Sequence, residues 1–162
     1  MQKPSFAKLH ALVAESSPHM ATLICSMLRH LKLQAAVEAH SSSEAVALLS
    51  TRPFGVIMLD DDLQPVDGVT LTRALRSSDD SPNRATPVIM MSSVPDAARI
   101  KAARDAGVTE FLRKPFAAAH VETRLVSLLA APRSFIDIGA YSGPDRRRRR
   151  AGYTGTDRRT ER

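Results

Sequence analysis

Short apolar runs that alternate with stretches of helical spacing constrain the fold of this chain more than any other feature. Five runs are short and apolar enough to be buried strands, and they comprise residues 10–14, 34–39, 54–59, 86–91 and 108–113. After each run, apolar residues recur at spacings of three and four, as Met20, Leu23 and Met27 do, which is typical of amphipathic helices. Five strand–helix pairs predict a doubly wound α/β fold, with a five-stranded parallel sheet covered by helices on both faces.

Capping residues mark several of the predicted helix ends. Ser17 before Pro18 predicts the start of the first helix, because serine suits the N-cap and proline suits the first helical position. Ser42 with Glu44 predicts the start of the second helix. Gly107 predicts a left-handed C-cap at the end of the fourth helix.

Polar residues gather where the predicted strands end. They are Glu15 and Ser16, Asp60 to Asp62, Ser92 and Ser93, and Lys114. Parallel α/β sheets bind their ligands beyond the carboxyl ends of the strands. The sequence therefore predicts a functional site at this edge of the sheet.

The hydrophobic periodicity ends at about Pro132, and this change predicts a division into two parts. Residues 1–131 form the compact domain, and residues 132–162 form an extension rich in Gly, Ser, Asp and Arg. From residue 131 on, nine arginines stand against four acids, which leaves a net charge of about +1 for the first 130 residues out of +6 in total. The basic character belongs to the extension, which we expect to be disordered when no ligand is bound.

The extension contains a repeated unit. Tyr141-Ser142-Gly143-Pro144-Asp145-Arg146-Arg147 recurs twelve residues later as Tyr153-Thr154-Gly155-Thr156-Asp157-Arg158-Arg159. An arginine run alone predicts only an anionic partner. The tyrosine and the aspartate of each unit add nothing to a plain patch of positive charge, so the repeat indicates a more specific ligand.

The side chains of one unit suit a guanine nucleotide. Arginine matches the O6 and N7 edge of guanine and also matches phosphate oxygens, aspartate accepts hydrogen bonds from the N1–H and the N2 amino group, and tyrosine can stack on the base. Two units suggest a ligand with two guanines and two-fold symmetry. Cyclic di-GMP has both properties, and it also stacks into an intercalated dimer. The candidate cyclic di-GMP-binding residues are Tyr141, Gly143, Asp145, Arg146, Arg147, Arg148, Arg149, Arg150, Tyr153, Gly155, Asp157, Arg158 and Arg159.

Three stretches of the first 130 residues resemble a response-regulator receiver domain of the CheY type. They are FGVIML ending in Asp60, with Asp67-Gly68 beyond it; TPVIMM running into Ser92; and GVTEFLRKPF, which contains Phe111, Lys114 and Pro115. The resemblance implies a flavodoxin-like sheet of strand order 2-1-3-4-5. It also implies that Asp60 is the phosphoacceptor, that Ser92 and Phe111 are switch residues, that Lys114 is the counter-ion of the phosphate, and that the Lys114–Pro115 bond is cis.

The same resemblance implies a Mg²⁺ site at Glu15 and Asp60, with one departure from the family. Receivers carry a pair of acids after the first strand, and here Ser16 replaces the second acid. Asp61 and Asp62 remain as alternative oxygen ligands. The sequence therefore leaves open whether Mg²⁺-dependent phosphorylation is intact.

The whole chain resembles the Cle group of CheY-like proteins, whose arginine-rich C-terminal extension binds cyclic di-GMP. The resemblance implies a cytoplasmic signalling effector, not an enzyme, that acts on a flagellar motor switch protein at the flagellated pole, reduces motility and favours surface attachment. A histidine kinase or a phosphotransfer protein would be a further partner.

The alternative is a single-domain phosphorelay regulator whose basic extension binds nucleic acid or acidic proteins without specificity. Asp145 and Asp157 argue against this alternative, since each would repel a phosphate backbone. No helix-turn-helix follows the receiver-like part, so no specific DNA partner is expected. No stretch approaches the roughly 18 apolar residues of a membrane helix, so no membrane insertion is expected either.

Overall fold

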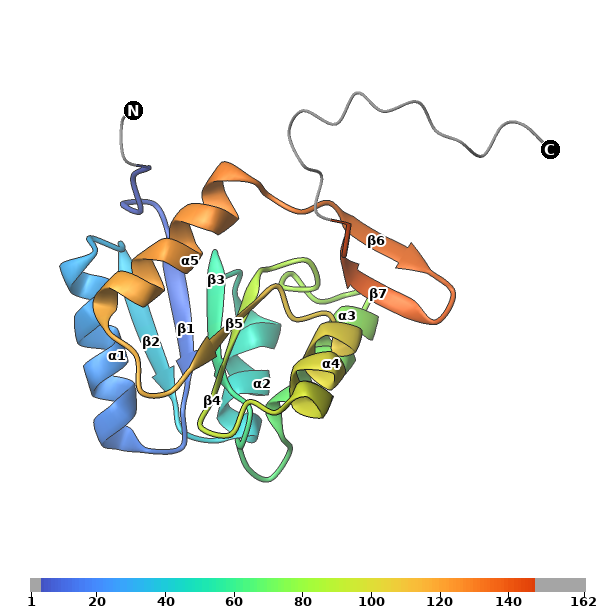
Figure 1. The fold of residues 1–162 in the computed structure, drawn as a ribbon, viewed down its shortest axis with the longest axis horizontal. Helices are drawn as coiled ribbons and strands as arrows, with labels where there is room; N and C mark the ends of the chain where they lie inside the picture. The colour runs from blue at the N-terminus through green and yellow to red at the C-terminus, as the bar shows by residue number, and fades with distance from the viewer. Residues whose placement is uncertain (1–3, 148–162) are drawn as a thin grey trace.

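The computed structural model describes residues 4–147, and their core is a five-stranded parallel sheet (Figure 1). The strand order is β2-β1-β3-β4-β5, which confirms the predicted fold class and topology. The strands are β1 (His10–Ala14), β2 (Ala35–Ala39), β3 (Val56–Asp60), β4 (Val88–Ser92) and β5 (Glu110–Arg113). Each lies within two residues of its predicted start and end.

Five helices cover the two faces of the sheet. They are α1 (Pro18–His30), α2 (Ser42–Thr51), α3 (Gly68–Ser77), α4 (Ala97–Ala106) and α5 (Ala118–Ala130). Helices α1 and α5 pack on one face, and α2, α3 and α4 pack on the other. Strand residues alternate between the two layers, so that in β3 Met58 contacts the α1 and α5 side while Ile57 and Leu59 contact the opposite side. Both faces are apolar, which is why these strands read as continuous hydrophobic runs.

The caps agree with the sequence at two of the three predicted positions. The Ser17 side chain accepts a hydrogen bond from the Met20 backbone N–H, and Gly107 has a φ of 99° at the end of α4. The N-cap of α2 is Ser41 and not Ser42, because the Ser41 hydroxyl accepts from the Glu44 N–H while Ser42 is already helical and buried.

A β-hairpin follows α5, and it corrects the prediction for the extension. Strands β6 (Phe135–Ile138) and β7 (Tyr141–Pro144) pair antiparallel, and they join through Gly139, whose φ of 56° suits a tight turn. The expectation that the unliganded extension is disordered is therefore wrong for residues 135–144. Arg148, Arg149, Arg150, Tyr153, Gly155, Asp157, Arg158 and Arg159 lie outside the described residues.

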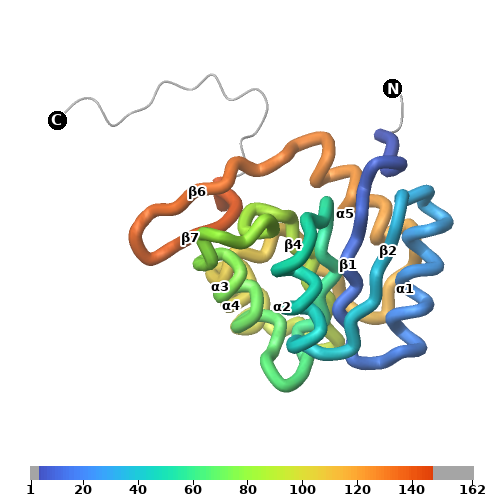
Figure 2. Tube along the Cα trace, turned by 180° about the vertical axis from the view of Figure 1, so that it is seen from behind, coloured from blue at the N-terminus to red at the C-terminus, as the bar shows by residue number. Residues whose placement is uncertain are grey.

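The hairpin packs against the C-terminal ends of α3 and α4, on the same side of the sheet as these helices (Figure 2). A Cβ added at Gly143 would lie 2.9 Å from the Gly107 Cα, so the two glycines let β7 approach the end of α4. Arg84 pairs with Asp137 of β6 and lies 5.1 Å from the ring centroid of Phe135. An isolated two-stranded hairpin is only marginally stable in water, and these contacts with the rest of the domain stabilise it.

Within residues 4–147, no helix is long and apolar enough to cross a membrane.

Candidate functional site

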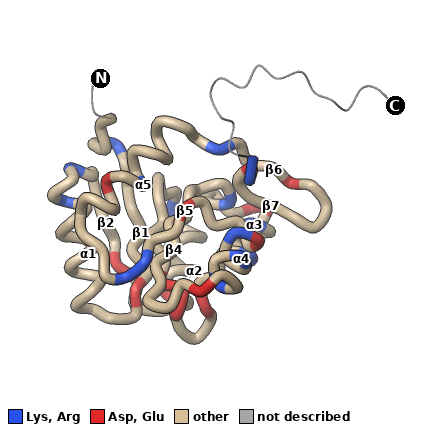
Figure 3. The backbone as a smooth tube through the Cα atoms, in the orientation of Figure 1, with Lys and Arg blue, Asp and Glu red and all other residues tan. Residues whose placement is uncertain are grey.

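Three predicted site residues meet at the carboxyl end of the sheet. Asp60 ends β3, Glu15 follows β1 and Lys114 follows β5. The Lys114 Nζ lies 2.6 Å from the Glu15 Oε2 and 3.1 Å from the Asp60 Oδ1. Figure 3 shows acidic positions gathered at this end of the molecule. The two carboxylates are buried and share one ammonium group, which leaves a net negative charge in the site.

Burial dominates the electrostatics of this cluster. It raises the pKa of Asp60 above its usual value, the Glu15 carboxylate raises it further, and Lys114 lowers it by less. Burial lowers the pKa of Lys114, but the hydrogen bond to Glu15 and the charge of Asp60 outweigh burial and leave the pKa of Lys114 raised. The site therefore disfavours a second negative charge and favours a bound cation.

The predicted switch residues occupy different surroundings. Ser92 ends β4 at the same edge as Asp60; it is buried, and its hydroxyl accepts from the Val94 N–H at 3.2 Å. Phe111 in β5 is half-buried and faces a hollow between α4 and the β-hairpin. The Lys114–Pro115 bond is cis, as predicted.

Comparisons with known proteins agree with this arrangement. Residues 11–126 match the model of the family described as the response regulator receiver domain. The chain belongs to this family. The chemotaxis protein CheY of Pseudomonas aeruginosa is 28% identical over 107 residues, which are 66% of this chain and 85% of that protein. The chemotaxis protein CheY-3 of Vibrio cholerae is 25% identical over 114 residues, or 70% of this chain and 86% of that protein.

Solved receiver structures share the fold. The receiver domain of a Pseudomonas aeruginosa sensor histidine kinase, which holds a magnesium ion in its active site cleft, is 26% identical with a TM-score of 0.65; the match covers 75% of this chain and 96% of that one. CheY4 of Vibrio cholerae has a TM-score of 0.68 at 21% identity, over 74% of this chain and 97% of that one, which shows the fold alone.

The receiver acids fit a magnesium ion with a reduced set of protein ligands. Mg²⁺ commonly binds one or two carboxylates and completes its shell with waters. Glu15 and Asp60 supply two carboxylates; burial first and their mutual repulsion second raise the pKa of Asp60, and a cation would relieve that repulsion. Ser16 is exposed and adds no charge. Among the described residues, no group of three His, Cys, Asp or Glu side chains could hold a metal.

Asp61 is not free to replace the missing acid. It is buried, and its Oδ2 accepts a hydrogen bond from the Arg99 Nε at 2.5 Å. Arg99 lies on α4, and the sequence does not predict this contact, because only the packing of α4 brings position 99 next to position 61. The signal in the sequence is a cation in the first turn of the helix that follows β4.

The first copy of the repeat lies on β7 and directly after it. The Tyr141 hydroxyl donates to the Pro144 carbonyl at 2.7 Å, and the Arg146 guanidinium lies 3.8 Å from the centroid of the Tyr141 ring. Arg146 also pairs with Asp105 of α4 at 3.2 Å. Gly143 is buried against Gly107. In this structure Tyr141, Gly143 and Arg146 contact the receiver or one another.

Asp145 and Arg147 differ from these three residues. The Asp145 N–H donates to the Ser134 carbonyl at 2.8 Å, and its Oδ1 accepts from the Arg147 N–H at 2.9 Å. The Arg147 side chain is exposed. The structure thus presents an aspartate and an arginine of the repeat, held by backbone bonds at the open end of the hairpin.

Proposed function

We propose that this receiver protein is a signalling effector that binds cyclic di-GMP through its extension. The duplicated Tyr-x-Gly-x-Asp-Arg-Arg unit carries the proposal. In the first unit the Arg147 N–H uses Oδ1 of the Asp145 carboxylate, and no other residue of the range 4–147 hydrogen-bonds this carboxylate, so Oδ2 is open to a ligand. A carboxylate with a free oxygen suits the N1–H and N2 donors of guanine, and it does not suit adenine, which presents an acceptor at N1.

The ligand would engage both units. Arg147 and its counterpart Arg159 would bind phosphate or the O6 and N7 edge of the bases, since the arginine fork matches both. Tyr153 would stack on a base. The loaded protein would act on a flagellar motor switch protein to reduce motility, a role that follows from the resemblance to the Cle group, together with the cytoplasmic location and the recruitment to the flagellated pole.

Calorimetry on the full-length protein tests the proposal. We expect cyclic di-GMP to bind and cyclic di-AMP not to bind at the same concentrations. Arg147→Ala should weaken binding by roughly tenfold or more, the usual cost of one charge-assisted hydrogen bond. Arg29→Ala, an exposed arginine on α1, should leave the affinity unchanged. Equal affinity for the two dinucleotides would contradict the proposal.

The second candidate function is phosphotransfer to Asp60. The observation that favours it is the Lys114 ammonium 3.1 Å from the Asp60 carboxylate, placed to neutralise a phosphoryl oxygen. An Asp60 oxygen would attack phosphorus, and the donor would leave with the bonding electrons; Mg²⁺ would supply charge neutralisation.

Intact mass spectrometry after incubation with acetyl phosphate and Mg²⁺ tests the second candidate. We expect a gain of one phosphate in the wild type and none in Asp60→Asn. An unshifted wild-type mass, or a gain that persists in Asp60→Asn, would rule out this role for Asp60.

A further inference from the structure

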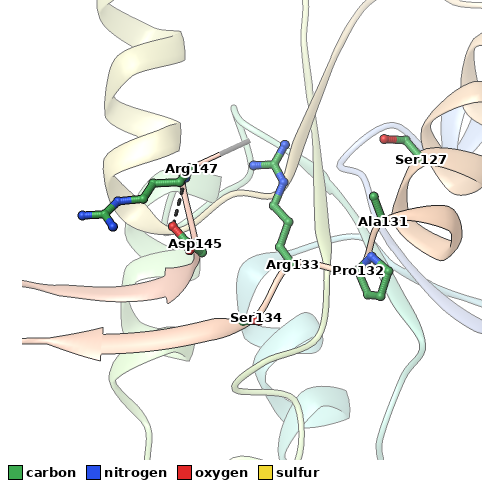
Figure 4. A pocket seen from close by; sticks show the side chains of 7 residues that line it. All are labelled: Ser127, Ala131, Pro132, Arg133, Ser134, Asp145 and Arg147. Carbon is green, nitrogen blue, oxygen red and sulfur yellow. Dashed lines mark hydrogen bonds between the residues drawn. The ribbon is translucent and has the colours of Figure 1, made fainter. Parts of the chain in front are cut away.

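A hollow lies at the base of the hairpin, between the end of α5 and the first repeat unit. It has a volume of about 370 Å³, and its walls include Ser127, Ala131, Pro132, Arg133, Asp145 and Arg147. Figure 4 shows Ser127, Ala131 and Pro132 on one side, Asp145 on the other, and Arg133 between them. Ligand sites are commonly about 300–1,000 Å³. This hollow is at the low end of that range and suits one nucleotide rather than a whole dinucleotide.

The walls of this hollow combine the groups that a guanine nucleotide requires. Pro132 and Ala131 offer an apolar surface to a base, and the Asp145 carboxylate offers acceptors. The Asp145 N–H donates to the Ser134 carbonyl, and the Asp145 Oδ1 accepts from the Arg147 N–H, so these two bonds orient the carboxylate before a ligand arrives. A guanine with N1–H and N2–H₂ toward Asp145 would lie beside the Arg133 side chain, which stands between Asp145 and Pro132.

Arg133 supplies a cation that lies outside the repeat. Its Nη2 lies 3.3 Å from the Glu110 Oε1, a contact that orients the guanidinium. A guanidinium has five N–H donors, so one contact with Glu110 leaves donors for a phosphate. Arg124 also lies 4.0 Å from Glu110, so one buried carboxylate faces two arginines and the local charge stays positive.

We propose that this hollow is a nucleotide subsite, in which Asp145 binds the base and Arg133 binds the phosphate of one half of the ligand. The inference deepens the proposed function and rests on it. It adds the end of α5, which belongs to the receiver, and Arg133, which lies between α5 and β6, to a site that the repeat alone places farther along the extension. The bound ligand therefore holds the extension against the receiver.

Calorimetric titration of the full-length protein with cyclic di-GMP tests the subsite with two variants outside the repeat. Ser127→Phe fills the hollow from α5, and Arg133→Ala removes the cation; each should weaken binding by about tenfold or more. Ala119→Phe adds the same ring at an exposed position two turns earlier on α5 and should bind as the wild type does. Glu110→Gln removes the carboxylate that contacts Arg133 but keeps the Arg133 cation, so this variant should retain most of the affinity for cyclic di-GMP. Thermal unfolding of each variant confirms that it is folded.

The outcomes separate the two proposals. No binding of cyclic di-GMP by the wild type would refute the proposed function and the subsite together. Wild-type binding that is unchanged in both Ser127→Phe and Arg133→Ala would refute the subsite and leave the proposed function standing. A loss confined to these two folded variants, with Ala119→Phe unaffected, would establish the subsite.

Discussion

At the scale of single residues, the charge on Asp60 costs the folded state free energy. Its pKa is raised by burial and by Glu15, so the folded protein binds a proton more readily than the unfolded chain does. The penalty is absent below the unfolded pKa, grows as the pH rises through the raised folded pKa, and is complete above it. A neutral side chain of the same shape avoids the penalty.

Asp60→Asn should therefore melt at a higher temperature than the wild type at pH 7, and the gain should shrink as the pH falls toward 4. Differential scanning calorimetry at several pH values measures this trend. Asp62→Asn is the matched control, because Asp62 is the exposed neighbour of the same loop. A lower melting temperature for Asp60→Asn at pH 7 would show that the bond to Lys114 outweighs burial and repulsion.

Arg76 is a second residue whose burial has a measurable consequence. It is 1% exposed, and burial lowers its pKa to about 10, although the nearby Tyr141 opposes this shift. Its guanidinium donates to the carbonyls of Gly107, Arg84 and Thr86. The cation thus joins the end of α3 to the loop before β4 and to the C-cap of α4.

Arg76→Ala should lower the free energy of unfolding by about 3 kcal/mol or more, since three carbonyls lose their donor in a buried setting. Urea denaturation measures the loss. Arg73→Ala, exposed on the same helix, should change stability by less than about 0.5 kcal/mol. Equal losses in the two variants would mean that the buried hydrogen bonds of Arg76 contribute little.

At the scale of elements, the sequence predicts the strands and helices that local apolar spacing determines. It does not predict the contacts that depend on tertiary packing. The strands and helices of the receiver follow from apolar spacing and from caps such as Ser17 and Gly107. The acid site follows because parallel strands bring their carboxyl ends together. The Arg99–Asp61 pair could not be predicted, since it depends on how α4 packs.

The hairpin was missed for a similar reason. Phe135-Ile136-Asp137-Ile138 is a short run that could form a strand, and Gly139 could form a turn, but β7 contains Gly143 and Pro144, which are poor strand formers. Its position depends on the close approach of Gly143 to Gly107. No local signal encodes that contact between two glycines 36 positions apart in the sequence.

Gly143→Ala should release the hairpin from the receiver. The added methyl group would lie 2.7 Å from the Tyr141 hydroxyl and 2.9 Å from the Gly107 backbone, both closer than carbon contacts allow. We expect amide hydrogen exchange in residues 135–145 to rise by at least tenfold while β1, β3 and β4 stay protected. Gly139→Asn, at the open turn with nothing within 4 Å, should keep the wild-type exchange pattern.

At the scale of the whole molecule, α4 reaches both functional regions. Arg99 near its start binds Asp61 beside the phosphoacceptor candidate, and Asp105 near its end binds Arg146 of the first repeat unit. Gly107 then contacts Gly143. The acid site and the extension therefore share a structural element, although they lie in different parts of the sequence.

The salt dependence of binding distinguishes a nonspecific basic extension from one that binds cyclic di-GMP. A basic tail that binds nucleic acid by charge alone, with nine arginines in contact with phosphates, would lose about 10³–10⁵ in affinity between 50 and 200 mM salt. Cyclic di-GMP carries two phosphates, so we expect its affinity to fall by less than about tenfold over the same range. Calorimetry for the dinucleotide and fluorescence anisotropy for a single-stranded RNA measure the two slopes.

Replacing both aspartates of the repeat makes the distinction sharper. Asp145→Asn with Asp157→Asn keeps every arginine, removes the two repulsive charges and takes away the acceptors proposed to bind guanine. This variant should bind single-stranded RNA more tightly than the wild type does and cyclic di-GMP at least tenfold more weakly. If both affinities rose together, the aspartates would only be reducing the positive charge, and the extension would be a nonspecific anion-binding segment.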